Sequence, residues 1–226
     1  MSGSTRRDDG GRGAGDDDRE PAIAEATTTA NSDQRSNTNT RLCRQIDSAA
    51  LGVTGDFSSS DGRRAYREKI GYDPASESYS ILDVPILHSG EGVEKYDPTR
   101  FLRSEMVMKV FVAMIRGPEA ARKFRPGKIF QPRTLTAEKM YRIRHITPHA
   151  IANAGMLMVW LFSCDVTLSE IGDVTTINYL QYYESYLELI LKGLNMRLPS
   201  IRGLIRAWDA AIFPTSGRAR VFATGI

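Results

Sequence analysis

The sequence predicts an all-α fold, a compact bundle of about four main helices behind a disordered N-terminal arm. Apolar residues recur at helical spacing from Tyr96 onward, in segments that glycine and proline separate. Apart from Met1, residues 1–41 contain only one large apolar side chain, Ile23. Most of the others are Gly, Asp, Arg, Ser, Thr and Asn. Such a segment cannot bury enough surface to offset the entropy of ordering it, so we expect it to be disordered.

The 226 residues suit one domain of average size with additional flexible segments. We expect a polar arm over 1–60, an irregular transition over 61–95, a helical domain over 96–214 and a loose tail over 215–226. Within the transition, residues 63–70 predict a short helix that Gly71 stops. Residues 79–87 predict an extended segment, which Pro85 would keep at the edge of a sheet.

The first two main helices are marked by their ends. Asp97 is a suitable N-cap before Pro98, and Gly117 followed by proline ends a helix that is apolar on most sides. Thr147 and Pro148 repeat the pattern of cap and first-turn proline. The helix that follows reaches residue 162, and we expect it to be the central one because it is the most apolar.

The third and fourth helices show amphipathic spacing. The third is expected from Thr176 to Gly193, and its apolar stripe should face the core: Leu180, Tyr183, Leu187, Ile190, Leu191 and Leu194. Glu188 and Lys192 fall on its other side and are spaced to pair. The fourth helix is expected over 200–213, between two prolines.

Positive charge is concentrated in the middle of the chain. Residues 100–144 contain twelve Lys and Arg residues but only Glu105, Glu119 and Glu138 as acidic side chains. This asymmetry predicts a binding surface for nucleic acid or another polyanion, although a solubilising surface would look the same. The residues expected to form the binding surface are Lys123, Arg125, Lys128, Arg133, Arg142 and Arg144, helped by Arg202 and Arg206.

Structural roles explain the other candidate metal-binding and catalytic side chains better. His145 and His149 straddle the start of a helix, and no Glu or Cys completes a metal set beside them. Cys164 lacks a nearby base, and Glu184 lies one turn from Glu188 on a polar helix face. Among the aromatic residues 179–186, Tyr182 is the one expected at the surface. We therefore expect no catalytic residue, metal or cofactor, and no small-molecule substrate.

The chain also shows no sign of export or of membrane insertion. Cys43 and Cys164 are too far apart to suggest a disulfide framework, and no apolar run follows Met1. The longest apolar stretch, 151–164, is too short to cross a bilayer. These features predict an intracellular, soluble protein without a membrane partner.

Three blocks of residues resemble a known family. The first comprises Tyr96-Asp97-Pro98, Leu102-Arg103-Ser104-Glu105, Val110-Phe111 and Gly117-Pro118; the second Ile146-Thr147-Pro148 with Ile151-Ala152; the third Trp208 with Ile212-Phe213-Pro214. In this order they are similar to a fungal family, abundant in basidiomycetes, that is defined only as a domain of unknown function. The resemblance covers about residues 83–214. It implies a fungal source and a helical fold, and it supplies no mechanism.

Three functional classes follow from these observations. We expect a non-enzymatic helical protein that binds a polyanion or other proteins. The alternative is a viral-type helical nucleoprotein or coat subunit, which the size, helicity, basic middle and polar arm also suit. A hydrolase or transferase is the third class, and no visible pair of nucleophile and base supports it.

Overall fold

The computed structural model describes residues 60–64, 66–90, 92–93, 95–130, 132 and 134–214. This part of the chain is mainly helical, and four of its helices have 12 or more residues: α4 (Glu105–Arg116), α7 (Pro148–Phe162), α8 (Tyr179–Asn195) and α9 (Pro199–Ile212). The predicted all-α architecture with four main helices is confirmed. The predicted disordered arm over 1–60 lies outside the described residues except for Ser60, which begins a helix, and the predicted loose tail over 215–226 lies outside them too.

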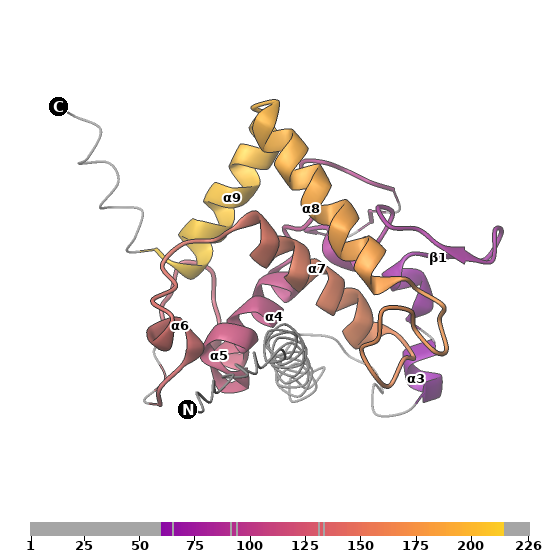
Figure 1. Ribbon diagram of the computed structural model, residues 1–226, viewed down its shortest axis with the longest axis horizontal. Coiled ribbons are helices and arrows are strands. Elements are labelled where there is room, and N and C mark those ends of the chain that lie inside the picture. Colours follow the sequence, from indigo (N-terminus) through magenta and orange to yellow (C-terminus); the bar gives the residue numbers. More distant parts are fainter. Residues whose placement is uncertain are drawn as a thin grey trace, which may run out of the picture. The chain divides into compact units, whose positions relative to one another are not determined.

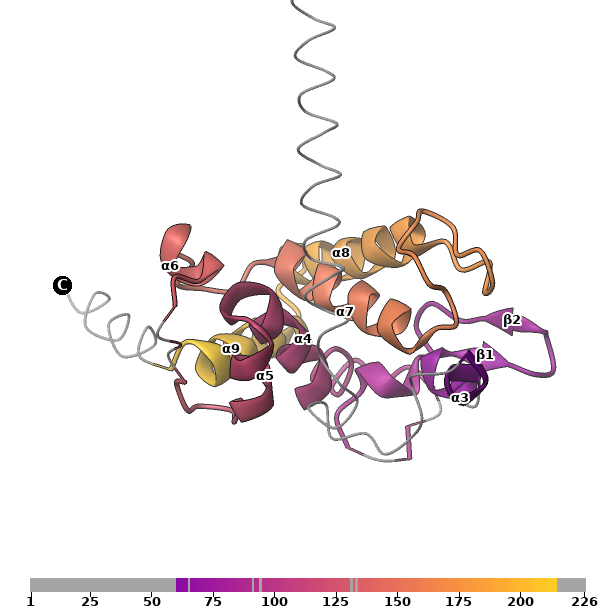
Figure 2. The same ribbon diagram turned by 90° about the horizontal axis from the view of Figure 1, so that it is seen from below.

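Helices α4 and α7 form the centre of the bundle (Figure 1). α7 lies between α8 and the segment that contains the two 3₁₀ helices η1 (Arg67–Ile70) and η2 (Pro85–Leu87) (Figure 2). Ile151, Ala152 and Val159 of α7 are fully buried. The side chain of Thr147 accepts a hydrogen bond from the amide of Ala150, as its predicted capping role requires. α7 is therefore the expected central helix, with α4 beside it.

The start of α4 differs from the prediction. Asp97 does not cap α4, because its carboxylate accepts hydrogen bonds from the amide and hydroxyl of Thr99 in a separate turn. Leu102 then adopts a positive φ of 56°, which ends any helical run, and α4 begins only at Glu105. Leu102 is nevertheless fully buried, and its carbonyl accepts a hydrogen bond from Nε1 of Trp208 on α9.

The transition segment holds more regular structure than the sequence suggested. Helix α3 (Ser60–Arg64) precedes η1, and Gly71, at a φ of 93°, ends η1 as expected. A short antiparallel pair, β1 (Tyr72–Asp73) and β2 (Ser78–Tyr79), follows. Of the extended segment expected over 79–87, Tyr79 lies in β2 and Val84 has an extended backbone. Residues 85–87 instead form η2, since proline at its start favours a helical turn.

The segment between α4 and α7, residues 117–147, is the basic connector, and it contains two short helices. α5 (Pro118–Lys123) begins directly after Gly117, and α6 (Ala137–Met140) has Thr136 as its cap. The ion pair of Arg116 with Glu138 and the hydrogen bond from Arg116 to the carbonyl of Ile212 connect α4, α6 and the end of α9.

Helix α8 faces the core with a side that shares only Ile190 with the predicted stripe. Its buried side chains are Tyr179, Tyr182, Tyr186 and Ile190, with Gly193. Tyr182 was expected at the surface, but it is 3% exposed and its hydroxyl donates to the carbonyl of Ser80. Leu180 and Leu191, which were expected in the core, are 45% and 44% exposed. The large tyrosine rings fill the space against α7, and the leucines are turned to one flank.

A buried polar network fastens the loop between α7 and α8. The Asp165 carboxylate accepts hydrogen bonds from the amides of Val174 and Thr175, from the Thr175 hydroxyl and from the Tyr179 hydroxyl. Burial acts to raise the pKa of Asp165, but these hydrogen bonds together hold that pKa below its usual value. The pKa of Tyr179 is raised by its burial and by its hydrogen bond to Asp165. The network therefore holds a charged carboxylate in the interior as a structural anchor.

Candidate polyanion-binding surface

The three acidic residues of the basic region are all neutralised by neighbouring cations. Glu105 pairs with Lys109 at 3.2 Å, and Glu119 pairs with both Arg122 and Lys123. Glu138 pairs with Arg116. Among the described cations of this region, Arg125, Lys128, Arg142 and Arg144 form no ion pair with these three acids.

The ion pair of Arg116 with Glu138 is well shielded from solvent. The two side chains are 3% and 14% exposed, and Arg116 Nε lies 2.5 Å from Glu138 Oε2. A second bond joins Nη2 to Oε1 at 2.8 Å, so the guanidinium is bidentate. This pair holds α6, and with it the middle of the connector, against α4.

Two hydrogen bonds fasten the connector to the C-terminal half of α9, one from its middle and one from its C-terminal end. The amide of Gly127, in the turn between Arg125 and Lys128, donates to the carbonyl of Ala211 at 2.9 Å. The amide of Ile146 donates to Oδ1 of Asp209 at 2.7 Å. Segments that are separate in the sequence thus meet at one end of the bundle.

Five of the predicted binding residues are exposed around this end of α9 and along it: Lys128, Arg142, Arg144, Arg202 and Arg206. Within the part of the chain that the structure describes, none of them forms an ion pair. Arg202 and Arg206 are one turn apart on α9, and Arg206 lies one turn before Asp209. Asp209 and Glu138 are the acidic groups at this end, and the Asp209 carboxylate already accepts the Ile146 amide while Glu138 is paired with Arg116. Five cations thus face only two acids, of which Glu138 is already paired with a cation, so the local charge is positive.

The other three residues predicted to bind a polyanion do not belong to this group of five exposed cations. Lys123 is half exposed, but its ammonium lies 2.9 Å from Glu119 and 4.7 Å from the centre of the Phe130 ring. Arg125 is exposed, and its guanidinium donates to the neighbouring carbonyl of Phe124. Arg133 lies outside the described residues. Lys123 is thus the weakest of the described candidates, because a polyanion would have to compete with Glu119 for it.

The other candidate side chains, the two histidines, the cysteine and the glutamates of α8, do not come together in one site. His145 and His149 are exposed beside the cap of α7, and the structure shows no cluster of three or more metal-ligating side chains among its described residues. Cys164 is 8% exposed at the far end of α7. Glu184 and Glu188 are exposed on α8. The ion pair predicted between Glu188 and Lys192 is not formed among the described residues.

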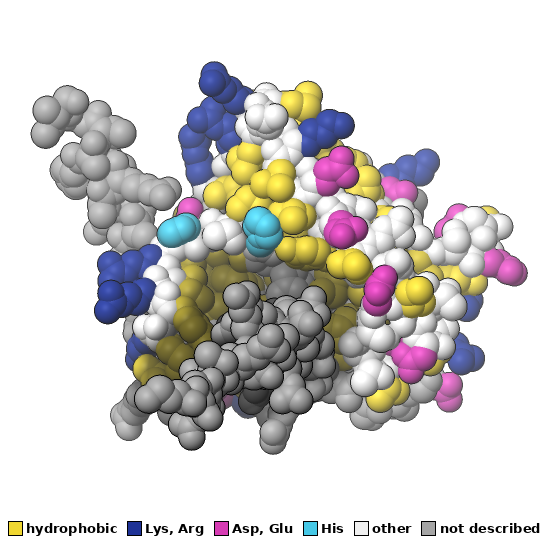
Figure 3. All heavy atoms as spheres, viewed as in Figure 1, with side chains coloured by type: hydrophobic (Ala, Val, Ile, Leu, Met, Phe, Trp, Pro, Cys, Tyr) yellow, Lys and Arg dark blue, Asp and Glu magenta, His cyan; other side chains and the backbone are white. Residues whose placement is uncertain are grey.

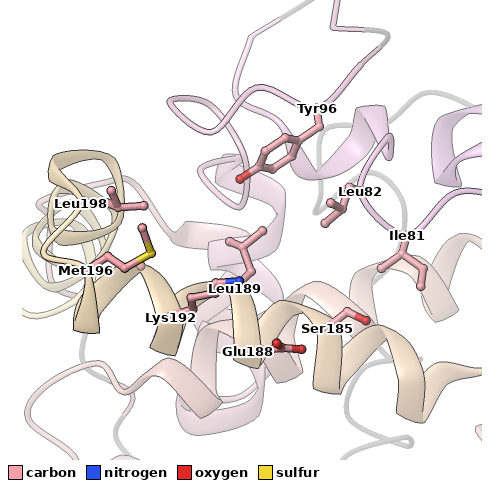
Figure 4. A pocket seen from close by; sticks show the side chains of 10 residues that line it. Ile81, Leu82, Tyr96, Ser185, Glu188, Leu189, Lys192, Met196 and Leu198 are labelled. Atoms are coloured by element: carbon pink, nitrogen blue, oxygen red, sulfur yellow. The ribbon is translucent and has the colours of Figure 1, made fainter.

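A pocket that the sequence did not suggest lies on one flank of α8. Its volume is about 500 Å³, and most of its lining is apolar, with Tyr96 and Leu82 opposite the helix (Figure 4). Ser185, Glu188 and Lys192 lie along the α8 side. The two charges cancel, so this pocket does not attract a polyanion. No local signal could reveal it, since residues about 100 positions apart form its walls.

Comparison with known proteins assigns the family. A model described as a family of unknown function, DUF6698, matches residues 30–213. The chain belongs to the DUF6698 family. This bears out the resemblance to a domain of unknown function, and the match extends further toward the N-terminus than expected. The DUF6698 match includes every described helix and both ends of the connector.

No curated protein and no solved structure matches the chain. Membership of DUF6698 therefore carries no activity or ligand to transfer. None of the helices in the described part of the chain is both long and apolar enough to cross a membrane.

Proposed function

We propose that this protein is a non-enzymatic binding module that holds a polyanion, such as nucleic acid, at the connector end of α9. The observation that carries the proposal is the attachment of the connector to α9 at two points, through Gly127 to Ala211 and Ile146 to Asp209. These two hydrogen bonds gather Lys128, Arg142 and Arg144 around one end of the bundle. Arg202 and Arg206 extend the positive charge along the helix.

The neutralised acids strengthen the proposal. A basic surface that only solubilises a protein can carry interspersed acids, because charge of both signs keeps a surface hydrated. Here the acids of the connector are bound to Arg116, Arg122 and Lys123, whereas the cations around α9 remain exposed. Such unpaired cations can exchange their counterions for phosphates, and the release of those counterions favours binding.

Whether the protein also has an enzymatic role stays untested. A fungal source and an intracellular location stay predictions as well. A nucleoprotein or coat subunit would use the same cations on RNA, but no contact in the described residues favours that assembly over a simple binder.

A salt titration of the purified full-length chain tests the proposal. Fluorescence anisotropy would follow binding to labelled single-stranded RNA and to duplex DNA as salt is raised. We expect the logarithm of the affinity to fall linearly with the logarithm of the salt concentration. The slope should be steeper by about 0.7 to 0.9 for each phosphate contacted. Absence of binding at low salt, or binding that salt does not weaken, would refute polyanion recognition.

A further inference from the structure

One flank of α8 carries a continuous apolar stripe that the bundle leaves partly uncovered. Five residues spaced three or four apart make up this leucine flank: Leu180, Tyr183, Leu187, Leu191 and Leu194. Leu180 and Leu191 are nearly half exposed, and the other three are partly buried. Single exposed leucines are common, but a stripe along a whole helix marks an interaction surface.

The apolar surface continues toward α9. The two helices meet closely at their crossing, where a side chain on Gly193 would contact Ile201. Ile205 lies one turn further along α9 and is partly exposed. Figure 3 shows hydrophobic side chains gathered over α8 and in the angle between α8 and α9. The leucine flank and Ile205 thus form one face.

Charges of opposite sign border this face. Glu184 and Glu188 are exposed on α8, next to the leucine flank around the helix. Arg202 and Arg206 are exposed on α9, next to Ile205. In Figure 3, acidic side chains lie along α8 and basic ones along α9, with the hydrophobic side chains between them. No ion pair within the described region uses any of these four residues.

This arrangement is complementary to itself. A two-fold axis that runs between α8 and α9 places the acidic border of one copy against the basic border of the other. The apolar strips then cover each other at the centre. A polyanion or an anionic membrane would meet Glu184 and Glu188 and be repelled, so neither fits the whole face.

We propose that the chain forms a symmetric homodimer through the leucine flank and Ile205, with Glu184 and Glu188 of each copy facing Arg202 and Arg206 of the other. The proposal does not depend on polyanion binding. In the dimer Arg202 and Arg206 face acidic side chains, so a polyanion is held there by Lys128, Arg142 and Arg144, whereas the monomer also offers the two arginines.

The mass of the nuclease-treated full-length protein, measured by light scattering or sedimentation across a dilution series, tests the dimer. We expect a monomer–dimer equilibrium. The variant L180E/L191E should weaken association about tenfold or more, because two buried apolar contacts are lost and charge is introduced. The matched control is L135E, which changes a leucine that is 72% exposed on the connector. Circular dichroism would verify that each variant is folded.

A charge exchange makes the test specific for the proposed geometry. The variant E184R/E188R and the variant R202E/R206E should each associate weakly alone, because like charges then face each other. A mixture of the two should form heterodimers, since every facing pair is again of opposite sign. A protein that is monomeric at all dilutions, an effect of L180E/L191E no larger than that of L135E, or a mixture that stays monomeric would overturn the proposal. None of these outcomes bears on nucleic-acid binding, which the salt titration measures separately.

Discussion

Arg116 of α4 and Glu138 of α6 form a bidentate ion pair, and the same guanidinium donates to the carbonyl of Ile212 at 2.9 Å. One side chain thus joins α4, the connector and the end of α9. Because the connector carries the proposed binding cations, this pair links the stability of the bundle to the shape of the binding surface.

Replacing Arg116 by alanine should be strongly destabilising. The change leaves Glu138 charged at a site that is only 14% exposed and removes the donor to Ile212. Breaking one partner of a shielded pair typically lowers the free energy of unfolding by about 3–5 kcal/mol. Urea unfolding would measure the loss. Arg122→Ala breaks an exposed ion pair with Glu119 and should lower the free energy of unfolding by at most about 1 kcal/mol. Equal effects of the two changes would contradict the anchoring role of Arg116.

Asp165 should make stability depend on pH in the acid range. Its pKa is held below the ordinary value in the folded protein, so its contribution is complete above the unfolded pKa and is lost as pH falls through the folded pKa. We expect Asp165→Asn to lower the free energy of unfolding near neutral pH by about 1–3 kcal/mol, since buried donors lose a charged acceptor. The difference from the wild type should shrink on acidification. A difference that is constant between neutral and acid pH would refute this assignment.

Gly193 should be required for the close crossing of α8 and α9. Alanine is the better helix former by about 1 kcal/mol, and on that ground alone Gly193→Ala would stabilise α8. Its methyl group would instead contact Ile201, which is 4% exposed and cannot move away without displacing α9. We expect a net loss of about 1–3 kcal/mol in thermal or urea unfolding. Asn195→Ala, at an exposed position of the same helix, should be neutral or slightly stabilising. A more stable Gly193→Ala variant would show that the crossing is loose.

The cations around the end of α9 should dominate the salt dependence of nucleic-acid binding. Replacing Lys128, Arg142 and Arg144 together by alanine should weaken binding and reduce the slope of log affinity against log salt by up to about 3. The control changes Lys69, Lys95 and Arg197, which are exposed and carry the same total charge. Anisotropy titrations of both triple variants would separate a local site from a general effect of net charge. Identical slopes in the two variants would rule out the local site.

The sequence by itself determined where most of the main helices begin or end. Thr147 with Pro148 starts α7, Gly117 ends α4, and Gly71 ends η1, as expected. These signals act over about four residues, because a cap bonds to the amides of the first turn and glycine permits a left-handed backbone. The excess of cations over acids between residues 100 and 144 was equally visible, since it is a property of composition.

Tertiary structure decided which surfaces those helices bury and what the charged residues meet. The face of α8 that enters the core is set by the space beside α7 and by the carbonyl of Ser80, 102 positions from Tyr182. Leu102 takes a strained backbone conformation where it meets Trp208, 106 positions away. The connector is held against α9 by hydrogen bonds from the amides of Ile146 and Gly127 to Asp209 and Ala211. Such contacts depend on pairs that are distant in the chain, and no local spacing encodes them.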